Sequence, residues 1–437
     1  MNMNKQIKGM QAIVLILSCA LIFAGCGNAK NVANQRELAA ETAPASSAAA
    51  EPVEIEFWYG GNQLTSEQIE EYNGSQTKVK VKAVVVQNYY DGIVEKLQVQ
   101  AAAKKLPDVV QMGLLYTKFA DEKVHAVPLE PLMEKDKFDT DDFFPNMLNL
   151  GKTSEGKQIG IPGGISSPVL FYNADQFREA GLDPDVPPKT WDEVREYAKK
   201  LTKENRYGFF VAADDSWQYQ ALMQTFGGSM MAADGKSVGL DSPESVKAVQ
   251  FVSDLINVDK SMPMLEQMQS FESMGKGNVS MLVSSGATLE LIRSYGGGFD
   301  LRAAPYPTQD GKRSVAAGGY NLMIFSTDEA KQEASWDFIK FMTDTKRSVQ
   351  VAKSTGYMVA RKSALNDPEM AQFLKDNPAA NATYEQIEQL VPWFNFPGGT
   401  KLQKIISDQV QAVLQKQKNA PQAMKDAAEL ANALNKS

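Results

Sequence analysis

The chain is poor in the side chains that most often carry covalent and metal chemistry. It has two cysteines, Cys19 and Cys26, and one histidine, His125. Both cysteines precede the folded sequence, which therefore has no thiol for a disulfide, a thiolate metal site or a nucleophile. His125 has no metal-ligand spacing around it, and we expect it on the surface. No Gly-x-Ser-x-Gly elbow, P-loop or HExxH motif occurs, so we expect no enzyme activity, metal or cofactor.

An excess of basic residues is also missing. The net charge is −8 and the sequence pI is about 5.1, which makes the chain a poor partner for nucleic acid. Hydrophobic residues make up 43% and charged residues 22% of the chain, as in ordinary soluble globular proteins. The 437 residues are enough for two lobes, each with its own core.

Long hydrophobic runs are absent apart from one near the N-terminus. Met10–Phe23 is almost entirely apolar and follows two lysines, but about 14 residues are too short to span a bilayer. This segment therefore predicts a cleaved signal peptide over residues 1–25. Phe23-Ala24-Gly25-Cys26 resembles a lipobox, in which the cysteine becomes lipid-modified, although Leu is usual where Phe23 stands. The alternative is ordinary secretion with cleavage near Ala24, and both place the mature protein outside the cytoplasm.

Residues 26–52 are rich in Ala, Asn, Glu and Ser and show no apolar periodicity. This composition predicts a flexible tether. A coil of this length has an r.m.s. reach of about 25–30 Å, which is enough to hold a folded domain clear of a membrane surface.

The folded sequence begins with alternating strands and helices. Val53–Tyr59 alternates like a strand, and further strands are predicted at Val79–Val86 and Pro107–Met112. We expect the intervening helices to begin at Ser66 and to cover Asp91–Ala103. This order is typical of an α/β lobe with a largely parallel sheet.

Strands and helices alternate again after Gly160. The predicted strands are Pro168–Asn173, Tyr207–Val211, Ser280–Val283, Leu301–Pro305 and Tyr320–Phe325, and the last two are expected to return to the first lobe. The predicted helices lie near 215–226, 242–257, 401–417 and 421–435. Another helix is expected after Thr190, because Glu193 completes a capping box with it. Trp191 and Trp336 are expected in the core.

Several short motifs follow one another in a specific order and spacing. They include Ser166–Asn173, Ala180–Pro184, Pro187–Trp191, Asn278–Met281, Gly318-Gly319 and Thr355–Tyr357. Together they resemble the extracellular solute-binding proteins of ABC importers, in the subgroup that takes up sugars and glycerol phosphates. The resemblance covers about 53–435, although the family's Gly-Tyr-Leu-Pro becomes Gly-Tyr-Met-Val at residues 356–359.

The resemblance implies a two-lobed α/β fold like that of periplasmic binding proteins. Each lobe would be a mostly parallel sheet flanked by helices, and hinge segments would join the lobes. Lobe one would contain 53–166 and 303–356, and lobe two 167–302 and 357–437. The chain would cross near 166–168, 301–305 and 356, and a solute would be enclosed between the lobes.

The resemblance also implies which side chains contact the solute. Aromatic rings cover the apolar faces of sugars, and fixed polar groups bind their hydroxyls. At least one ring of Trp58 and Tyr59, at the end of the first strand, is expected to face the cleft. Tyr89, Ser166, Trp217, Ser284 or Ser285, Gly318 or Gly319, and Tyr357 match contact positions of the family. Trp393 is a further stacking candidate from its position just before the Gly398-Gly399 loop.

Departures from the family pattern bear on the substrate. Glycerol-phosphate binders carry a glutamate where Leu114 stands, and an arginine in the late loop around Asn395–Gly399, where the nearest cation is Lys401. Without an arginine fork for phosphate, a neutral mono- or oligosaccharide is favoured. A glycerol-phosphate-type solute and a ligand-presenting sensor subunit remain alternatives. Asp214-Asp215 could mimic paired glycosidase carboxylates, but a solvated loop is favoured because adjacent side chains point apart.

These inferences predict a substrate-binding lipoprotein without a cofactor. Its expected partners are a small carbohydrate, the transmembrane subunits of an ABC permease and the membrane, reached through a lipid on Cys26. We expect a monomer that binds no nucleic acid and lies on the outer face of the cell membrane.

Overall fold

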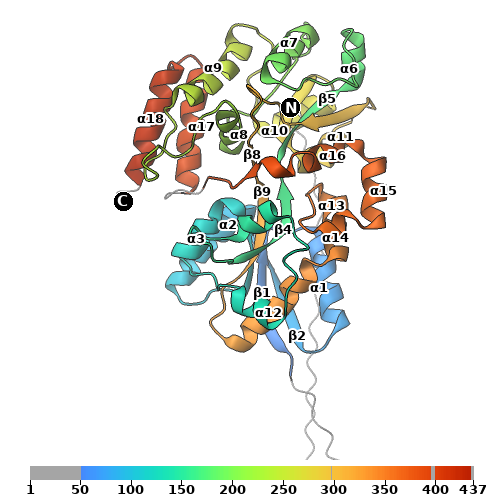
Figure 1. Ribbon diagram of the computed structural model, residues 1–437, viewed down its shortest axis with the longest axis vertical. Coiled ribbons are helices and arrows are strands. Elements are labelled where there is room, and N and C mark those ends of the chain that lie inside the picture. Colours follow the sequence, from blue (N-terminus) through green and yellow to red (C-terminus); the bar gives the residue numbers. More distant parts are fainter. Residues whose placement is uncertain (1–50, 297, 395–398, 435–437) are drawn as a thin grey trace, which may run out of the picture. The chain divides into compact units, whose positions relative to one another are not determined.

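The computed structural model describes residues 51–296, 298–394 and 399–434. The predicted signal peptide, the lipidation site at Cys26 and nearly all of the tether lie outside the described residues. Two sheets organise the described chain, and each is covered by helices (Figure 1). We call the two sheets with their helices lobe one and lobe two. Within the described residues, no helix combines the length and apolar character needed to cross a bilayer.

Lobe one is built on a five-stranded sheet with the order β2-β1-β3-β9-β4. Its first three strands pair in parallel, whereas β9 pairs antiparallel with both β3 and β4. The strands are β1 (Val53–Tyr59), β2 (Val79–Val85), β3 (Val109–Gly113), β4 (Gly160–Ser166) and β9 (Gly318–Ile324). The helices are α1 (Gln63–Ser75), α2 (Tyr89–Ala102), α3 (Thr117–Glu122), α4 (Glu130–Lys135), α5 (Pro145–Leu148), α12 (Glu329–Met342), α13 (Thr345–Thr355), α14 (Lys362–Leu365) and α15 (Pro368–Asp376), with the 3-10 turns η1 (Leu114–Tyr116) and η2 (Asn149–Gly151).

Lobe two is built on a three-stranded sheet with the order β6-β5-β7 and a short pair, β10-β8. The strands are β5 (Pro168–Asn173), β6 (Met281–Ser285), β7 (Leu301–Pro305), β8 (Val315–Ala316) and β10 (Leu390–Val391). The helices are α6 (Ala174–Glu179), α7 (Trp191–Leu201), α8 (Ser216–Thr225), α9 (Pro243–Asn257), α10 (Gln267–Gly275), α11 (Leu289–Ser294), α16 (Pro378–Tyr384), α17 (Thr400–Leu414) and α18 (Ala420–Ala433), with η3 (Gly286–Thr288) and η4 (Ile387–Gln389).

The structure confirms the two-lobed α/β architecture but corrects the strand directions of lobe two. Its three-stranded sheet is antiparallel, because β5 pairs antiparallel with both β6 and β7. The predicted strand Tyr207–Val211 is reduced to two parallel bridges, Tyr207 with Val279 and Phe210 with Leu282. β7 was expected to return to lobe one, but it stays in lobe two through Pro305 because its whole length pairs with β5.

The chain changes lobes later than the predicted boundaries at residues 303 and 357. β8 still pairs with β10, so the return to lobe one comes between Ala316 and Gly318. After α13 the chain remains with lobe one, since Met358 bridges to Ile165 and the Phe144 N–H donates to the Ala360 carbonyl. The final passage into lobe two lies between α15 and α16, which packs beside β7.

The structure confirms the predicted helix cap at Thr190 and the predicted burial of two tryptophans. Thr190 caps α7 and forms the predicted capping box with Glu193, with Oγ1 accepting from the Glu193 N–H at 3.1 Å. Trp191 is fully buried, and Trp336 is 2% exposed, so both are core residues as predicted. His125 is exposed.

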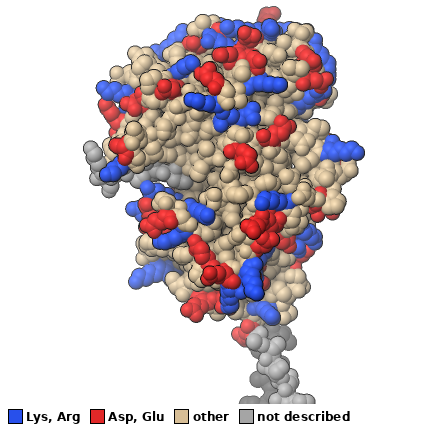
Figure 2. Space-filling view, viewed as in Figure 1, with Lys and Arg blue, Asp and Glu red and all other residues tan. Residues whose placement is uncertain are grey.

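Charged side chains do not gather by sign on the surface seen in Figure 2. Lys and Arg are interspersed with Asp and Glu over that face of the molecule. Ion pairs such as Lys346–Glu71 and Lys353–Glu369, both 2.9 Å, connect neighbouring elements. That face therefore presents no extended basic surface to a polyanion.

Candidate functional site

The two lobes are joined where β4 and β9 lie next to each other. β4 ends at Ser166 and β5 of lobe two begins at Pro168, while β9 begins at Gly318, two residues after β8 ends. Ser166 pairs with Gly318, so two of the passages between the lobes are adjacent. Figure 1 shows β4 and β9 leading from the lobe-one sheet towards α8. Residues at these strand ends are therefore placed where both lobes contribute side chains.

Glycine permits the two strands to approach closely at this position. Gly319 has φ +107, and a Cβ added there would overlap the carbonyl oxygen of Gly164 on the paired strand. A Cβ at Gly318 would lie 2.7 Å from Ser166 Oγ and 3.2 Å from Trp217 Cζ2. The predicted residues Ser166, Gly318 and Gly319 are thus brought together, and their backbone lies directly beside an indole ring.

Two indole rings from lobe two lie next to each other, and one of them, Trp217, lies beside this strand end. The rings of Trp217, in the first turn of α8, and Trp393 have centroids 6.0 Å apart and an interplanar angle of 46°. Trp217 is 5% exposed and Trp393 is partly exposed. Trp217 Nε1 is buried and has no hydrogen-bond partner among the described residues. A buried donor of this kind is normally paired, so it is available to an added acceptor.

Four tyrosines of lobe one form a second aromatic group. Two begin α2, one lies in β9 and one follows α13. The ring of Tyr320, two residues beyond Gly318, lies 6.5 Å from Tyr90 and 5.9 Å from Tyr357, and Tyr90 lies 6.1 Å from Tyr89. Burial and the interaction with Tyr357 raise the pKa of Tyr90, and burial raises the pKa values of Tyr320 and Tyr357. These phenols therefore remain neutral hydrogen-bonding groups at physiological pH.

Glycines lie under this tyrosine group as well. A Cβ at Gly113 would be 2.7 Å from the ring of Tyr90, and one at Gly164 would be 2.9 Å from Tyr320 and 3.1 Å from Tyr357. We call Tyr89, Tyr90, Ser166, Trp217, Gly318, Tyr320, Tyr357 and Trp393 the crossing site. None of these eight residues is an acidic or basic one.

Trp58 and Tyr59 do not join the crossing site. Both are 2% exposed and lie in hydrophobic cores on opposite faces of the lobe-one sheet, because successive strand residues alternate in direction. Trp58 Nε1 donates to Glu56 and Lys96 covers its ring, while Tyr59 stacks on Phe57 at 5.4 Å. The expected cleft-facing ring is therefore absent at these two positions, since helices cover both faces of the sheet.

The predicted serines of β6 lie near the same passage. Ser285 is opposite Pro168, two residues beyond Ser166, and its Oγ accepts from the Ala287 N–H at 3.2 Å. Ser284 is 2% exposed and pairs with Val169 inside the lobe-two sheet. Ser285 is thus at the edge of the site, and Ser284 is in the sheet interior.

Residues that sequence reasoning missed complete the arrangement. Tyr90 and Tyr320 stand next to predicted positions, and the Tyr-Tyr pair and the Gly-Gly-Tyr run were the available signals. Gln111 Oε1 accepts from the Gly60 N–H at 3.1 Å, and Gln220 contacts the segment around Trp393. No sequence signal points to the glutamines, because their partners are backbone groups distant in the chain.

Asp215 caps the helix that carries Trp217. Its Oδ1 accepts from the Trp217 N–H at 3.0 Å, and its Oδ2 accepts from Gln218 Nε2 at 2.9 Å and Gln267 Nε2 at 2.7 Å. Burial raises the pKa of Asp215, whereas the hydrogen bonds from Gln218 and Trp217 oppose that increase. Asp215 is therefore a helix cap with its hydrogen bonds filled, as expected for a structural carboxylate.

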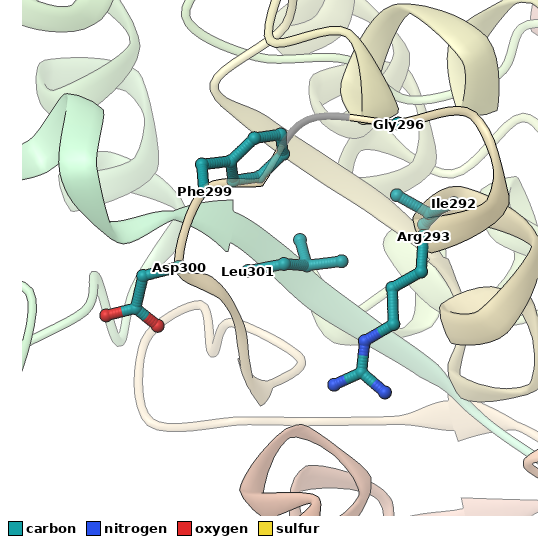
Figure 3. A pocket seen from close by; sticks show the side chains of 6 residues that line it. All are labelled: Ile292, Arg293, Gly296, Phe299, Asp300 and Leu301. Atoms are coloured by element: carbon teal, nitrogen blue, oxygen red, sulfur yellow. The ribbon is translucent and has the colours of Figure 1, made fainter.

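Two cavities lie away from the crossing site, beside β7 and α11. One, of about 280 Å³, is lined by Ile292, Arg293, Gly296, Phe299, Asp300 and Leu301 (Figure 3). The other, of about 930 Å³, shares Arg293, Asp300 and Leu301 with it. Arg293 pairs with Glu290 at 2.5 Å and Asp300 with Arg302 at 2.9 Å, so these charges are already neutralised. Among the described residues, no three His, Cys, Asp or Glu side chains are grouped to hold a metal ion.

Comparisons with known proteins identify relatives that align with most of this chain. The family model for bacterial extracellular solute-binding proteins matches residues 60–347. The sn-glycerol-3-phosphate-binding periplasmic protein UgpB of Brucella abortus is 26% identical over 408 residues, covering 87% of this chain and 92% of that protein. The corresponding protein of Escherichia coli is 25% identical and covers 68% of this chain and 72% of its own length.

Solved structures share the fold. UgpB from Mycobacterium tuberculosis in complex with glycerophosphocholine has a TM-score of 0.79 and 24% identity, covering 89% of this chain and 99% of that one. The cyclic alpha-maltosyl-1,6-maltose binding protein from Arthrobacter globiformis has a TM-score of 0.75 and 22% identity, covering 88% and 99%. At these identities the likeness establishes the fold alone.

The close approach of β4 and β9 predicts that Gly319→Ala is strongly destabilising. The added Cβ would meet the Gly164 carbonyl and would also require a φ of +107, which L side chains rarely adopt. We expect a loss of more than about 2 kcal/mol in the free energy of unfolding, measured by urea denaturation. Gly181→Ala is the matched control, since φ is +72 there but no atom lies within 4 Å of the new Cβ. Equal losses in the two variants would contradict the close approach.

Proposed function

The chain belongs to the bacterial extracellular solute-binding protein family, and from this premise we propose that it captures a neutral mono- or oligosaccharide at the crossing site. As a member of this family it is a binding protein and not an enzyme, and it acts outside the cytoplasm. It serves an ABC importer by delivering a small solute to the permease. The carbohydrate ligand, the lipid anchor and a monomeric state are the proposed refinements.

The observation that carries the carbohydrate proposal is the pair of indoles beside the Ser166–Gly318 strand end. The rings of Trp217, which is 5% exposed, and of Trp393, which is partly exposed, have centroids 6.0 Å apart, and Trp217 lies next to the Ser166 hydroxyl and the Gly318 backbone. Sugars present apolar C–H faces together with hydroxyl edges, so rings and fixed polar groups are the matching chemistry. The unpartnered Trp217 Nε1 and the neutral tyrosine hydroxyls add hydrogen-bonding capacity.

The neutrality of the site argues against a phosphate ester. Bidentate arginine is the usual partner of phosphate, and no member of the crossing site is basic. Leu114, at the position where glycerol-phosphate binders carry glutamate, is 3% exposed and lies in the core. The second candidate is a glycerol-phosphate-type solute. It is favoured by the similarity of this chain to sn-glycerol-3-phosphate-binding proteins, which align with 87% of it.

A ligand screen tests the choice between these solutes. Neutral saccharides should raise the melting temperature of the purified chain from residue 52 onwards, because a ligand bound only to the folded state stabilises it by about 2.7 kcal/mol at 100 times Kd. Glycerol 3-phosphate at equal concentration should give no shift. A shift with glycerol 3-phosphate or glycerophosphocholine, and none with a broad saccharide panel, would reject the carbohydrate assignment.

The indole assignment is tested by replacing one ring. Trp217→Ala should weaken binding of the saccharide found in the screen by about tenfold or more, or about 1.4 kcal/mol, measured by isothermal titration calorimetry. Trp217→Phe keeps an aromatic face and should retain more of the affinity. Trp336→Phe, a change in the lobe-one core, serves as the control for general destabilisation. Unchanged affinity in Trp217→Ala would remove this ring from the ligand contacts.

We further propose that Cys26 is lipidated and holds the protein at the outer face of the membrane. Cys26→Ser should move the protein from the membrane fraction to the medium or periplasm, because one residue change removes the acyl attachment. The expected readouts are detergent partitioning and metabolic labelling with a fatty acid. Labelling that persists in Cys26→Ser, or membrane retention equal to that of the unmodified sequence, would show that Cys26 is not the anchor.

A further inference from the structure

Gln220 links helix α8 to the segment that carries Trp393. It is 2% exposed and lies three residues after Trp217 on the same helix. Its Nε2 donates to the Pro392 carbonyl at 3.0 Å, and its Oε1 accepts from the Phe394 N–H at 2.8 Å. The two backbone groups flank Trp393, so one side-chain amide holds the chain on both sides of that indole.

The contact of Gln220 with this segment begins directly after β10, where the pairing of β10 with β8 ends. β10 consists only of Leu390 and Val391, and the Val391 carbonyl accepts from the Ala317 N–H at 2.8 Å. Beyond Val391, the two hydrogen bonds from Gln220 continue the anchoring as far as Phe394. Pro392 has no N–H to contribute to a ladder, so its carbonyl is a natural acceptor for a side-chain donor.

Helix α8 therefore controls both members of the indole pair. It carries Trp217 directly, in a first turn fixed by the Asp215 cap, and it positions the Trp393 backbone through Gln220. Residues three apart on a helix share a face, which directs Trp217 and Gln220 towards the same segment. A buried glutamine is costly unless both amide atoms are paired, and here both are paired with this segment.

We propose that Gln220 is a positioning residue that sets the separation and angle of the Trp217–Trp393 pair, and thereby the fit of a solute face against it. The proposal rests on the proposed function for its consequence in binding, but the positioning itself is a property of the protein without solute. Removing the amide leaves the Pro392 carbonyl and the Phe394 N–H without these partners, so the Trp393 segment shifts relative to α8.

The first test measures the geometry without any ligand. Two indoles 6.0 Å apart couple their electronic transitions and give a paired band in circular dichroism, which is assigned by its loss in Trp217→Phe and Trp393→Phe. Gln220→Met keeps the side-chain length and removes both hydrogen bonds to the Trp393 segment, together with the one to Gln224 Oε1 at 3.3 Å, and it should reduce this band. Gln220→Glu keeps the acceptor for Phe394 but removes the donor to Pro392, and it should also change the band.

Gln158→Met is the matched control. Gln158 is 3% exposed and its Nε2 also donates to two backbone carbonyls, those of Leu148 and Gly160, but it lies in lobe one and outside the crossing site. It should lower the melting temperature without altering the paired band. If Gln220→Met and Gln220→Glu both keep the band of the unmodified protein, or if Gln158→Met changes it equally, the positioning role is overturned. If Gln220→Met fails to fold, Gln220→Glu alone decides.

The second test measures binding of the saccharide found in the screen. Gln220→Met should raise Kd by about tenfold, equivalent to about 1.4 kcal/mol, whereas Gln158→Met should leave Kd unchanged. Unchanged Kd in Gln220→Met would overturn the consequence for solute fit. If the unmodified protein binds no saccharide, the proposed function fails, and the circular dichroism measurement still decides the role of Gln220.

Discussion

The arrangement of the site depends on one backbone constraint, the close antiparallel approach of β4 and β9. Gly319 adopts a positive φ directly against the Gly164 carbonyl, and Ser166 pairs with Gly318 one step further on. The chain leaves β4 for β5 of lobe two, and it enters β9 from β8 of lobe two. Because two passages between the lobes are adjacent, side chains from both lobes lie around the same strand end.

Aromatic side chains surround that strand end because glycines leave room for them. The ring of Tyr320 approaches Gly164 from its own strand, Tyr90 approaches Gly113, and Trp217 approaches Gly318. In each case a Cβ on the glycine would press on the ring. The glycines thus have two roles in this region, since Gly319 permits a backbone conformation and the others leave space that the rings occupy.

Local patterns in the sequence were sufficient for most elements and for some of the site. The capping box at Thr190, the strand Pro168–Asn173 and the buried Trp191 follow from short-range rules, and Ser166, Trp217 and Gly318 do meet in space. The prediction of a cleft-facing ring at Trp58 or Tyr59 was wrong. Alternation along β1 predicts that the two side chains lie on opposite faces of the sheet, but it does not show that helices bury both faces. Gln220 was not predictable, since its partners lie more than 170 residues away.

The division of rings between the lobes explains how a solute could bias their relative position. Tyr89, Tyr90 and Tyr320 belong to lobe one, whereas Trp217 and Trp393 belong to lobe two. A ligand shifts a conformational equilibrium only by its difference in affinity for the two states, so contacts with one lobe alone would bind solute without favouring closure. In the proposed function, a neutral solute would contact both groups, and the uncharged members of the crossing site would select it by shape and hydrogen bonding. Positioning of Trp393 by Gln220 then matters because a rigid ring face, held before the solute arrives, requires less ordering on binding than a mobile one.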